Sequence, residues 1–361
     1  MSVRFYHGFN AVEWASLRAR SPTHGTSWLS AMASRLPGDL YTVISDQKIG
    51  FIGTIVKDAN AYEAYNPAAI FWRDEPVFPI ADSIRRIDYL KSVREGYPPT
   101  LPALVLVAPG YVGDPAGANV FDEKVASCVL VEIVDWARAL GLSSVHILYT
   151  TNPTIHSAVR ELSGVSYSLA TRSILKVTWD NWDGYLGKLP SKKRVEFRKE
   201  WRRAADELSF GEFPASEFVD DIVEGRCAVL QRYGQSASSE AELSRLKSLI
   251  AAFGSNVIAY GGLAERRLEA SCLCLRDGRC LNALYSSLTE SGRKVPYAHL
   301  AATYYAIIRH NPAAVCDEID YGIGHRETKE ARGCIPITLY GHAIPLKQGG
   351  VTSFEEAASY L

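Results

Sequence analysis

The sequence predicts an α/β protein made of two domains in tandem, each with a mixed central sheet flanked by helices. The chain has 361 residues, a length that suits two domains of ordinary size better than one. Each half also shows strand-like segments followed by a loop, a helix and a further strand. The predicted domains span residues 1–178 and 179–361. A hinge is expected near residues 178–190, where aromatic, Gly and Pro residues interrupt the periodicity.

The first half alternates between strand-like and helix-like segments. Residues 39–46 and 48–56 alternate β-branched and aromatic side chains, which predicts adjacent strands joined by a tight turn. Residues 102–109 form a nearly continuous apolar run, typical of a central strand that is covered on both faces. After a glycine-containing loop, an apolar-periodic helix over residues 121–141 leads to a strand over residues 144–150. Together these segments predict one crossover unit of a sheet.

The second half repeats this order without residue-level identity to the first. Three helix-like segments precede three strand-like segments, and a further helix leads to a last strand. The segments span residues 189–208, 216–233, 238–253, 256–263, 268–275, 280–287, 297–309 and 315–321. The internal repeat is therefore one of pattern alone.

The composition excludes several classes of protein. A formal net charge of -1 gives no general attraction to nucleic acid or anionic lipid, so such a partner needs a local patch. The seven cysteines are odd in number and lie mostly in apolar runs, which favours reduced thiols over disulfides or zinc ligands. The N-terminus lacks a signal-peptide pattern, and no apolar run approaches the roughly 18 residues of a membrane span. We therefore expect a cytoplasmic protein with no membrane span and no metal.

The densest polar cluster is the segment Asp320–Cys334, which begins where an apolar strand ends. Open α/β sheets place their ligands at such strand ends. The cluster contains Asp320, His325, Lys329 and Arg332. In an acyl-transfer site a cation stabilises the oxyanion, and a carboxylate or imidazole takes the proton of an attacking amine. The alternative is an ordinary strand-to-turn connection with solvated charges.

Two motifs resemble the Fem-type branch of the GNAT acyltransferase superfamily and the related bacterial peptidoglycan biosynthesis or recognition proteins. One is W-D-G-Y-L-G-K-L-P-S-K-K-R-V-E-F-R-K-E-W-R-R over residues 182–203, similar to the opening of that group's second domain. The other is D-Y-G-x-G-H-R-E-T-K-E-A-R-G-C-x-P over residues 320–336. The resemblance spans roughly residues 170–345, while the first half matches only in its order of elements.

The resemblance implies two tandem GNAT-like domains, a degenerate N-terminal one that binds the acceptor and a catalytic C-terminal one. It places Lys329 at the lysine that stabilises the transition state of acyl transfer, with Asp320 on the strand leading into the site and Arg332 just beyond. Cys334 departs from the family, which has an aromatic residue there, and is expected to pack rather than to act as a nucleophile. For Lys329 the alternative is a surface lysine paired with Glu327 or Glu330.

The helix over residues 189–208 is strongly basic. Arg194, Arg198 and Arg202 are spaced four residues apart and share one face, while Glu196 and Glu200 lie elsewhere and can pair with neighbouring cations. A solvated, salt-bridged helix is the ordinary explanation. The functional alternative is a phosphate-binding surface for a tRNA acceptor arm or a nucleotide-linked substrate.

Neither loop that follows a central strand has the composition of a pyrophosphate-binding loop. The first, residues 110–117, contains an aspartate and no basic residue, and the second, residues 288–300, has a single glycine. This favours a donor other than acyl-CoA, and the Fem branch uses aminoacyl-tRNA. The expected substrate contacts are the basic face Arg194, Arg198 and Arg202, together with Tyr285, Tyr297, His299 and Tyr321.

We therefore expect an N-acyltransferase that passes an aminoacyl group from aminoacyl-tRNA to an amine acceptor by direct attack. The acceptor is a small metabolite or a peptidoglycan precursor, and no metal or redox cofactor takes part. The nearest alternative is an acyl-CoA-dependent GNAT N-acyltransferase. A second alternative is a non-catalytic GNAT-like pair that binds a cell-wall intermediate or nucleic acid.

Overall fold

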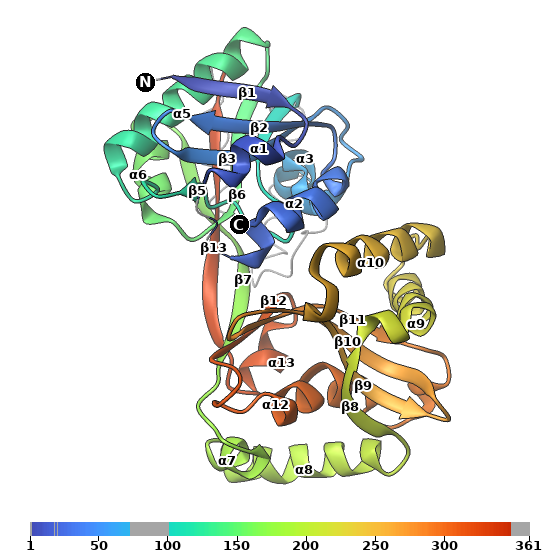
Figure 1. Ribbon diagram of the computed structural model, residues 1–361. Helices are drawn as coiled ribbons and strands as arrows, with labels where there is room; N and C mark the ends of the chain where they lie inside the picture. Colours follow the sequence, from blue (N-terminus) through green and yellow to red (C-terminus); the bar gives the residue numbers. More distant parts are fainter. Residues whose placement is uncertain (1, 18, 20, 73–100, 348–361) are drawn as a thin grey trace. The chain divides into compact units, whose positions relative to one another are not determined.

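A computed structural model describes residues 2–17, 19, 21–72 and 101–347. The chain forms two compact units (Figure 1): unit 1 combines the residues up to Ala170 with those from Thr338 on, and unit 2 spans Thr171–Ile337. The first boundary lies between Ala170 and Thr171, whereas the sequence predicts it between residues 178 and 179, and the chain returns to unit 1 after Ile337. Within the described ranges, no helix has the length and apolar character needed to cross a membrane.

Unit 1 is built on a mixed sheet with the strand order β1-β2-β3-β4-β6-β13. Its strands are β1 (Val3–His7), β2 (Asp39–Ser45), β3 (Ile49–Val56), β4 (Ala103–Leu106), β5 (Ala116–Gly117), β6 (Ser144–Thr150) and β13 (Ile335–Pro345). β4 and β6 pair in parallel, whereas β13 pairs antiparallel with β6. The predicted strands over residues 39–46, 48–56, 102–109 and 144–150 are confirmed.

Helices cover both faces of the unit 1 sheet. They are α1 (Ala11–Ala15), α2 (Thr26–Met32), α3 (Pro67–Trp72), α5 (Glu123–Ala139) and α6 (Pro153–Glu161). Val145 and Ile147 of β6 share one core with the apolar face of α5 and α6. His146 lies between them and faces the other side, where its ring is 5.7 Å from that of Phe71 in α3. This alternation follows from the two-residue period of a strand.

Unit 2 contains the sheet β7-β12-β11-β10-β9-β8. Its strands are β7 (Val165–Lys176), which begins in unit 1, β8 (Ser209–Pro214), β9 (Val257–Ala264), β10 (Arg267–Asp277), β11 (Cys280–Leu288) and β12 (Glu318–Ile323). All neighbours are antiparallel except β11 and β12. β7, β8 and β13 were not predicted, whereas β9 to β12 were.

The helices of unit 2 lie on both faces of this sheet. They are α7 (Trp182–Gly187), α8 (Ser191–Ala205), α9 (Val219–Arg232), α10 (Ser239–Phe253), α11 (Ala298–Leu300), the π-helical segment η7 (Ala301–Ala306), α12 (Ile307–His310) and α13 (Arg326–Glu330). Figure 1 shows α7 and α8 opposite α9 and α10. Gly225 lets α9 approach β11 closely, since a Cβ there would lie 2.7 Å from the Leu288 nitrogen.

The expected hinge near residues 178–190 is instead part of the unit 2 core. Trp179, Tyr185 and Leu186 are buried there together with the aromatic residues of η7. The interrupted periodicity arises because α7 is only six residues long and is capped by the Asn181 side chain, which accepts the Gly184 N–H. The prediction of a hinge at this position is wrong.

The parallel strands β11 and β12 diverge after a short pairing. Their register runs from Cys280↔Glu318 to Asn282↔Asp320, although β11 continues to Leu288 and β12 to Ile323. On the other edge of β12, the pairing with β7 shifts in register between Asp320 and Ile323. We call this region the β11/β12 fork. It presents the end of β12 and the turn into α13.

Candidate active site

The turn after β12 is fixed by left-handed backbone and by Asp320. Gly322, Gly324 and His325 have φ values of 65°, 79° and 49°, a region that glycine adopts readily and histidine rarely. One oxygen of Asp320 accepts the Gly322 N–H at 2.7 Å. The other lies 3.1 Å from Nε of Arg172 in β7. Asp320 therefore fixes the turn through one oxygen and forms an ion pair with Arg172 through the other.

Lys329 is buried beneath this turn, with 5% of its surface exposed. Its Nζ donates hydrogen bonds to the carbonyl oxygens of Tyr321, Gly322 and Ile323 at 2.7, 3.1 and 2.9 Å. Burial lowers the pKa of Lys329 to about 8, and the nearby Asp320 carboxylate acts in the opposite direction. The alternative of a surface lysine paired with Glu327 or Glu330 is therefore wrong. A cation is fixed at the end of the strand.

Arg332 ties the segment after α13 to two other elements. Its guanidinium donates to the Thr328 carbonyl and the Tyr305 hydroxyl, both at 2.8 Å, and lies 3.5 Å from Glu200 of α8. Tyr305 also donates to Glu200. The guanidinium carbon lies 4.8, 4.5 and 5.2 Å from the ring centroids of Phe197, Tyr304 and Tyr305. Arg332 is buried among these partners. Its contacts therefore hold α13 in position.

Two histidines from different segments gather beside the turn. Burial lowers the pKa of His299, and the charges of Arg232, His325 and Arg332 lower it further. His325 is exposed, and its ring centroid lies 6.4 Å from that of Tyr233 at the end of α9. The lowered pKa favours the neutral form of the His299 imidazole, and a neutral imidazole can accept a proton.

Tyr321 and Cys334 belong to the core under the turn. The Tyr321 ring lies 5.1 Å from that of Tyr304, and burial raises the pKa of its hydroxyl. Burial also raises the pKa of the Cys334 thiol to about 12, so it is protonated at neutral pH. The geometry is that of packing and not of a covalent nucleophile.

Tyr285 and Tyr297 make different kinds of contact. The guanidinium carbons of Arg226 in α9 and Arg245 in α10 lie 5.0 and 4.2 Å from the Tyr285 ring centroid. Tyr285 therefore supports the helices on its face of the sheet. Tyr297 precedes α11 with φ 63° and packs against the unit 2 core while half-buried.

The three arginines predicted as one basic face have different environments. Arg194 donates to the Leu189 carbonyl at 3.3 Å. Arg198 forms an ion pair with Asp183 at 3.0 Å, and Arg202 is exposed. The expected pairing of Glu196 with a neighbouring cation is confirmed, since Glu196 lies 3.0 Å from Lys193.

In the loop after β11, the backbone amides donate hydrogen bonds to other groups of the same loop. The N–H groups of Gly292, Arg293, Lys294 and Val295 donate to the Thr289 hydroxyl, the Thr289 carbonyl, the Ser291 carbonyl and the Gly292 carbonyl. The buried Glu269 carboxylate accepts hydrogen bonds from the hydroxyls of Thr289 and Ser291. A pyrophosphate cradle needs free amides and a positive field. In this loop the four amides from Gly292 to Val295 are already engaged.

In unit 1, the loop over residues 110–117 also uses its backbone amides in hydrogen bonds within the protein. Gly113 donates its N–H to the Tyr149 carbonyl of β6 at 3.1 Å, and Gly110 donates to the Tyr65 hydroxyl at 3.2 Å. Asp114 follows and accepts the amide protons of Thr151 and Asn152. The chain itself therefore occupies the β6 edge beyond the end of β4.

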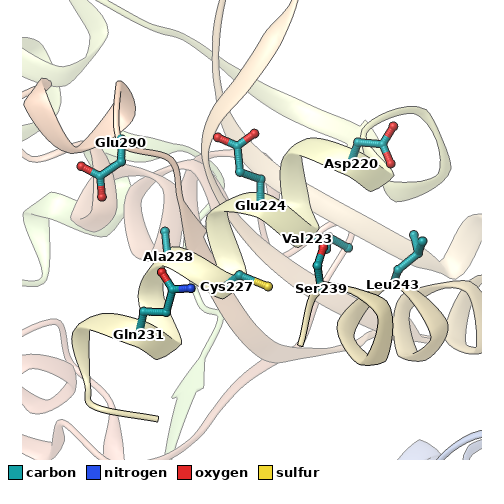
Figure 2. A pocket seen from close by; sticks show the side chains of 9 residues that line it. All are labelled: Asp220, Val223, Glu224, Cys227, Ala228, Gln231, Ser239, Leu243 and Glu290. Carbon is teal, nitrogen blue, oxygen red and sulfur yellow. The ribbon is translucent and has the colours of Figure 1, made fainter. Parts of the chain in front are cut away.

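A pocket of about 380 Å³ lies between α9, α10 and the loop after β11. Figure 2 shows the side chains that line it. Its polar lining includes Asp220, Glu224 and Glu290. Glu224 is paired with Arg267, and Glu290 lies 3.9 Å from Arg293. None of the predicted site residues lines this pocket, so it is distinct from the Lys329 turn.

Sequence reasoning missed three acidic or aromatic residues that organise the site. The sequence predicts that Glu200 pairs with a neighbouring cation, but Glu200 is buried against the distant Arg332, and Tyr305 completes that network. The third residue is Glu269, whose carboxylate fixes the loop after β11. A signal existed for Glu200, because it lies three residues from Phe197 on the buried face of α8. No local pattern singled out Glu269.

Comparison with known proteins places the chain in a family. The FemAB-like family model, described as peptidoglycan biosynthesis/recognition, matches residues 113–349. No protein with a curated description matches the chain.

Solved structures share the fold at low identity. FemX matches with 9% identity and a TM-score of 0.56, covering 99% of this chain and 100% of that one. A conserved protein of unknown function from Bacteroides thetaiotaomicron gives 9% identity and a TM-score of 0.56, with coverage of 95% and 100%. A tandem GNAT protein from the clavulanic acid biosynthesis pathway gives 11% identity, a TM-score of 0.43 and coverage of 96% and 100%. The predicted α/β fold, a mixed sheet flanked by helices, is confirmed, and FemX shares it. The chain belongs to the FemAB-like family, and this membership and fold support an acyltransferase-type function.

Proposed function

We propose that the chain transfers an aminoacyl group from aminoacyl-tRNA to the amine of a small metabolite or a peptidoglycan precursor. The proposed reaction takes place at the turn between β12 and α13, in the same unit as the fork. Family membership supports the reaction class, and the geometry of the loops supports the donor.

The observation that carries the choice of donor is the closure of the loop after β11. Four successive amides from Gly292 to Val295 are engaged inside the loop, above the Glu269 carboxylate. Coenzyme A needs such amides for its pyrophosphate, and a buried carboxylate opposes a second negative group. A donor that carries its acyl group on a ribose does not need this cradle.

The chemistry requires one bond to form and one to break. The acceptor nitrogen attacks the ester carbonyl, the new C–N bond forms, and the C–O bond to the ribose breaks. His325 takes the proton from the amine and returns a proton to the departing ribose oxygen. The Lys329 charge stabilises the oxyanion, while Asp320 and Arg332 fix the turn that holds it.

A transfer assay with separate donors tests the proposal. The protein is incubated with an amine acceptor and either radiolabelled aminoacyl-tRNA or radiolabelled acetyl-CoA, with and without prior RNase treatment. We expect label in the acceptor only from aminoacyl-tRNA, and none after RNase. Transfer from acetyl-CoA that is insensitive to RNase would instead establish the acyl-CoA alternative.

A further inference from the structure

A second cation, Arg172 of β7, lies beside the turn that holds Lys329. In the register of β7 and β12, Arg172 is opposite Ile323, whose carbonyl accepts a hydrogen bond from Lys329. Paired strands lie about 5 Å apart. The Arg172 side chain is half-buried, with 24% of its surface exposed. The fold therefore holds two cations at the same strand end, and the reaction proposed above uses only Lys329.

The ion pair with Asp320 leaves most of the Arg172 guanidinium available. The closest contact joins Nε of Arg172 to an Asp320 oxygen at 3.1 Å. An arginine has five N–H donors in a planar fork, and within the described ranges Arg172 forms no hydrogen bond and no other ion pair. Asp320 is itself held by the Gly322 N–H at 2.7 Å. The arginine is therefore anchored near Nε, while its two terminal nitrogens can bind a further anion.

Arg172 and the proposed base lie on the same side of the unit 2 sheet. On β12, the residues on either side of Asp320 belong to the core shared with α8 and η7, so Asp320 faces the side covered by α9 and α10 (Figure 1). The ion pair places the Arg172 guanidinium on that side as well. The ring of His325 lies 6.4 Å from that of Tyr233 at the end of α9. An acceptor whose amine reaches His325 can therefore place a second group on Arg172.

The charges at the turn favour a ligand with one negative charge. Lys329 and Arg172 are cations and Asp320 is a carboxylate, which leaves one positive charge. Glu330, on the helix after the turn, is already paired with Arg326 at 2.7 Å. A carboxylate balances the remaining charge, and its two oxygens match the planar fork of the guanidinium. A phosphate monoester carries a charge of about −2 at neutral pH and would be repelled by Asp320.

We infer that Arg172 binds a carboxylate of the acceptor through its terminal nitrogens. The enzyme then selects amines that also carry a carboxylate, such as an amino acid or a peptide. The inference rests on the proposed function, because it names the acceptor class of that reaction. Asp320 positions Arg172, while His325 acts at the amine of the same acceptor.

A comparison of matched acceptors in the transfer assay tests the inference. The acceptors are the common amino acids and, for each, the amine that remains after loss of the α-carboxyl group. The wild type should use the acid with a kcat/KM at least about 10-fold higher, the usual effect of a hydrogen bond between charged groups. In Arg172→Gln this preference should disappear through a rise in the KM for the acid. Arg172→Lys keeps the charge without the planar fork, so it should restore only part of the preference.

Arg138→Gln is the matched control, because Arg138 in α5 also pairs with a single carboxylate, that of Asp135 at 2.9 Å. It should leave the preference for the acid unchanged. If Arg172→Gln only disturbs the turn, kcat/KM falls equally for the acid and its amine, and the inference is overturned. A rise confined to the KM for aminoacyl-tRNA also overturns it, since Arg172 would then bind a phosphodiester of the donor.

Direct binding separates this inference from the proposed function. Isothermal titration calorimetry without donor compares each amino acid with its amine. If the wild type binds the acid at least 10-fold more tightly and Arg172→Gln binds both alike, but no aminoacyl group is transferred, the function is wrong while the carboxylate site stands. If the wild type transfers to acids and amines with equal kcat/KM, the carboxylate site is wrong while the function stands.

Discussion

At the residue scale, Lys329 combines burial with complete hydrogen bonding. An ammonium has three N–H donors, and those of Lys329 engage three successive carbonyls at the end of β12. It therefore acts on a reacting carbonyl through its charge, or by exchanging one backbone acceptor for the oxyanion. Either way the lysine also shapes the turn, so its removal has a structural and a catalytic component.

We expect Lys329→Ala to lower kcat by about 10²- to 10³-fold, the usual effect of losing one oxyanion-stabilising group. The measurement is a steady-state transfer assay on a variant whose fold is checked by circular dichroism. The neighbouring exposed Arg326→Ala is the control and should keep kcat within about 2-fold. A folded Lys329→Ala variant with at least half of the wild-type activity contradicts the role of this lysine.

The pH profile gives a second test at this scale. Because the pKa of Lys329 is lowered to about 8, its charge is present below that pH and is lost as the pH rises through it. We expect kcat to fall above about pH 8 in the wild type. In Lys329→Arg the charge persists, so any remaining activity should lack this alkaline decline. An identical decline in both proteins would show that another group titrates.

At the element scale, the buried network of Glu200, Tyr305 and Arg332 joins α8, η7 and the segment after α13. The spacing of apolar residues predicts helix α8 correctly from the sequence. It does not identify which of two glutamates on the helix is buried, because that depends on an arginine 132 residues away. The same reason explains why β8 and β13 were missed, since their partners are distant in sequence.

Glu200→Ala should destabilise unit 2 by about 3–5 kcal/mol, because it leaves the Arg332 charge buried without its partner. Glu196→Ala is the matched control on the same helix. It removes a partly exposed ion pair and should cost about 0–1 kcal/mol. Urea unfolding followed by fluorescence measures both. Equal losses for the two variants would contradict the account of the network.

At the scale of the whole molecule, the return of the chain to unit 1 was beyond sequence reasoning. Residues from Thr338 on pair with β6, as in Tyr340↔Thr150, and nothing near residue 340 signals a partner that early in the chain. The α/β class and the motif around Lys329 could be predicted, because both rest on local patterns. The contacts of Arg194, Arg198 and Tyr285 could not, because they depend on tertiary packing.

The described part of unit 1 also buries His24, His146 and His342, and burial lowers their pKa values to about 4, 3 and 3. In the unfolded chain these groups titrate near 6.5. Stability is therefore complete above about pH 6.5 and falls as the pH drops, by about 1.4 kcal/mol per pH unit for each group. We expect the melting temperature to decline steeply from pH 6.5 to pH 4. A constant melting temperature over this range would contradict the burial of these imidazoles.

The central claim is that this fold transfers an aminoacyl group and not an acyl group from coenzyme A. Competition in one reaction tests it most directly. Aminoacyl-tRNA and acetyl-CoA are present at equal concentration with an amine acceptor, and the product mass is determined by mass spectrometry. The account predicts a product heavier by one aminoacyl residue and no acetylated product. An acetylated acceptor as the main product would contradict it.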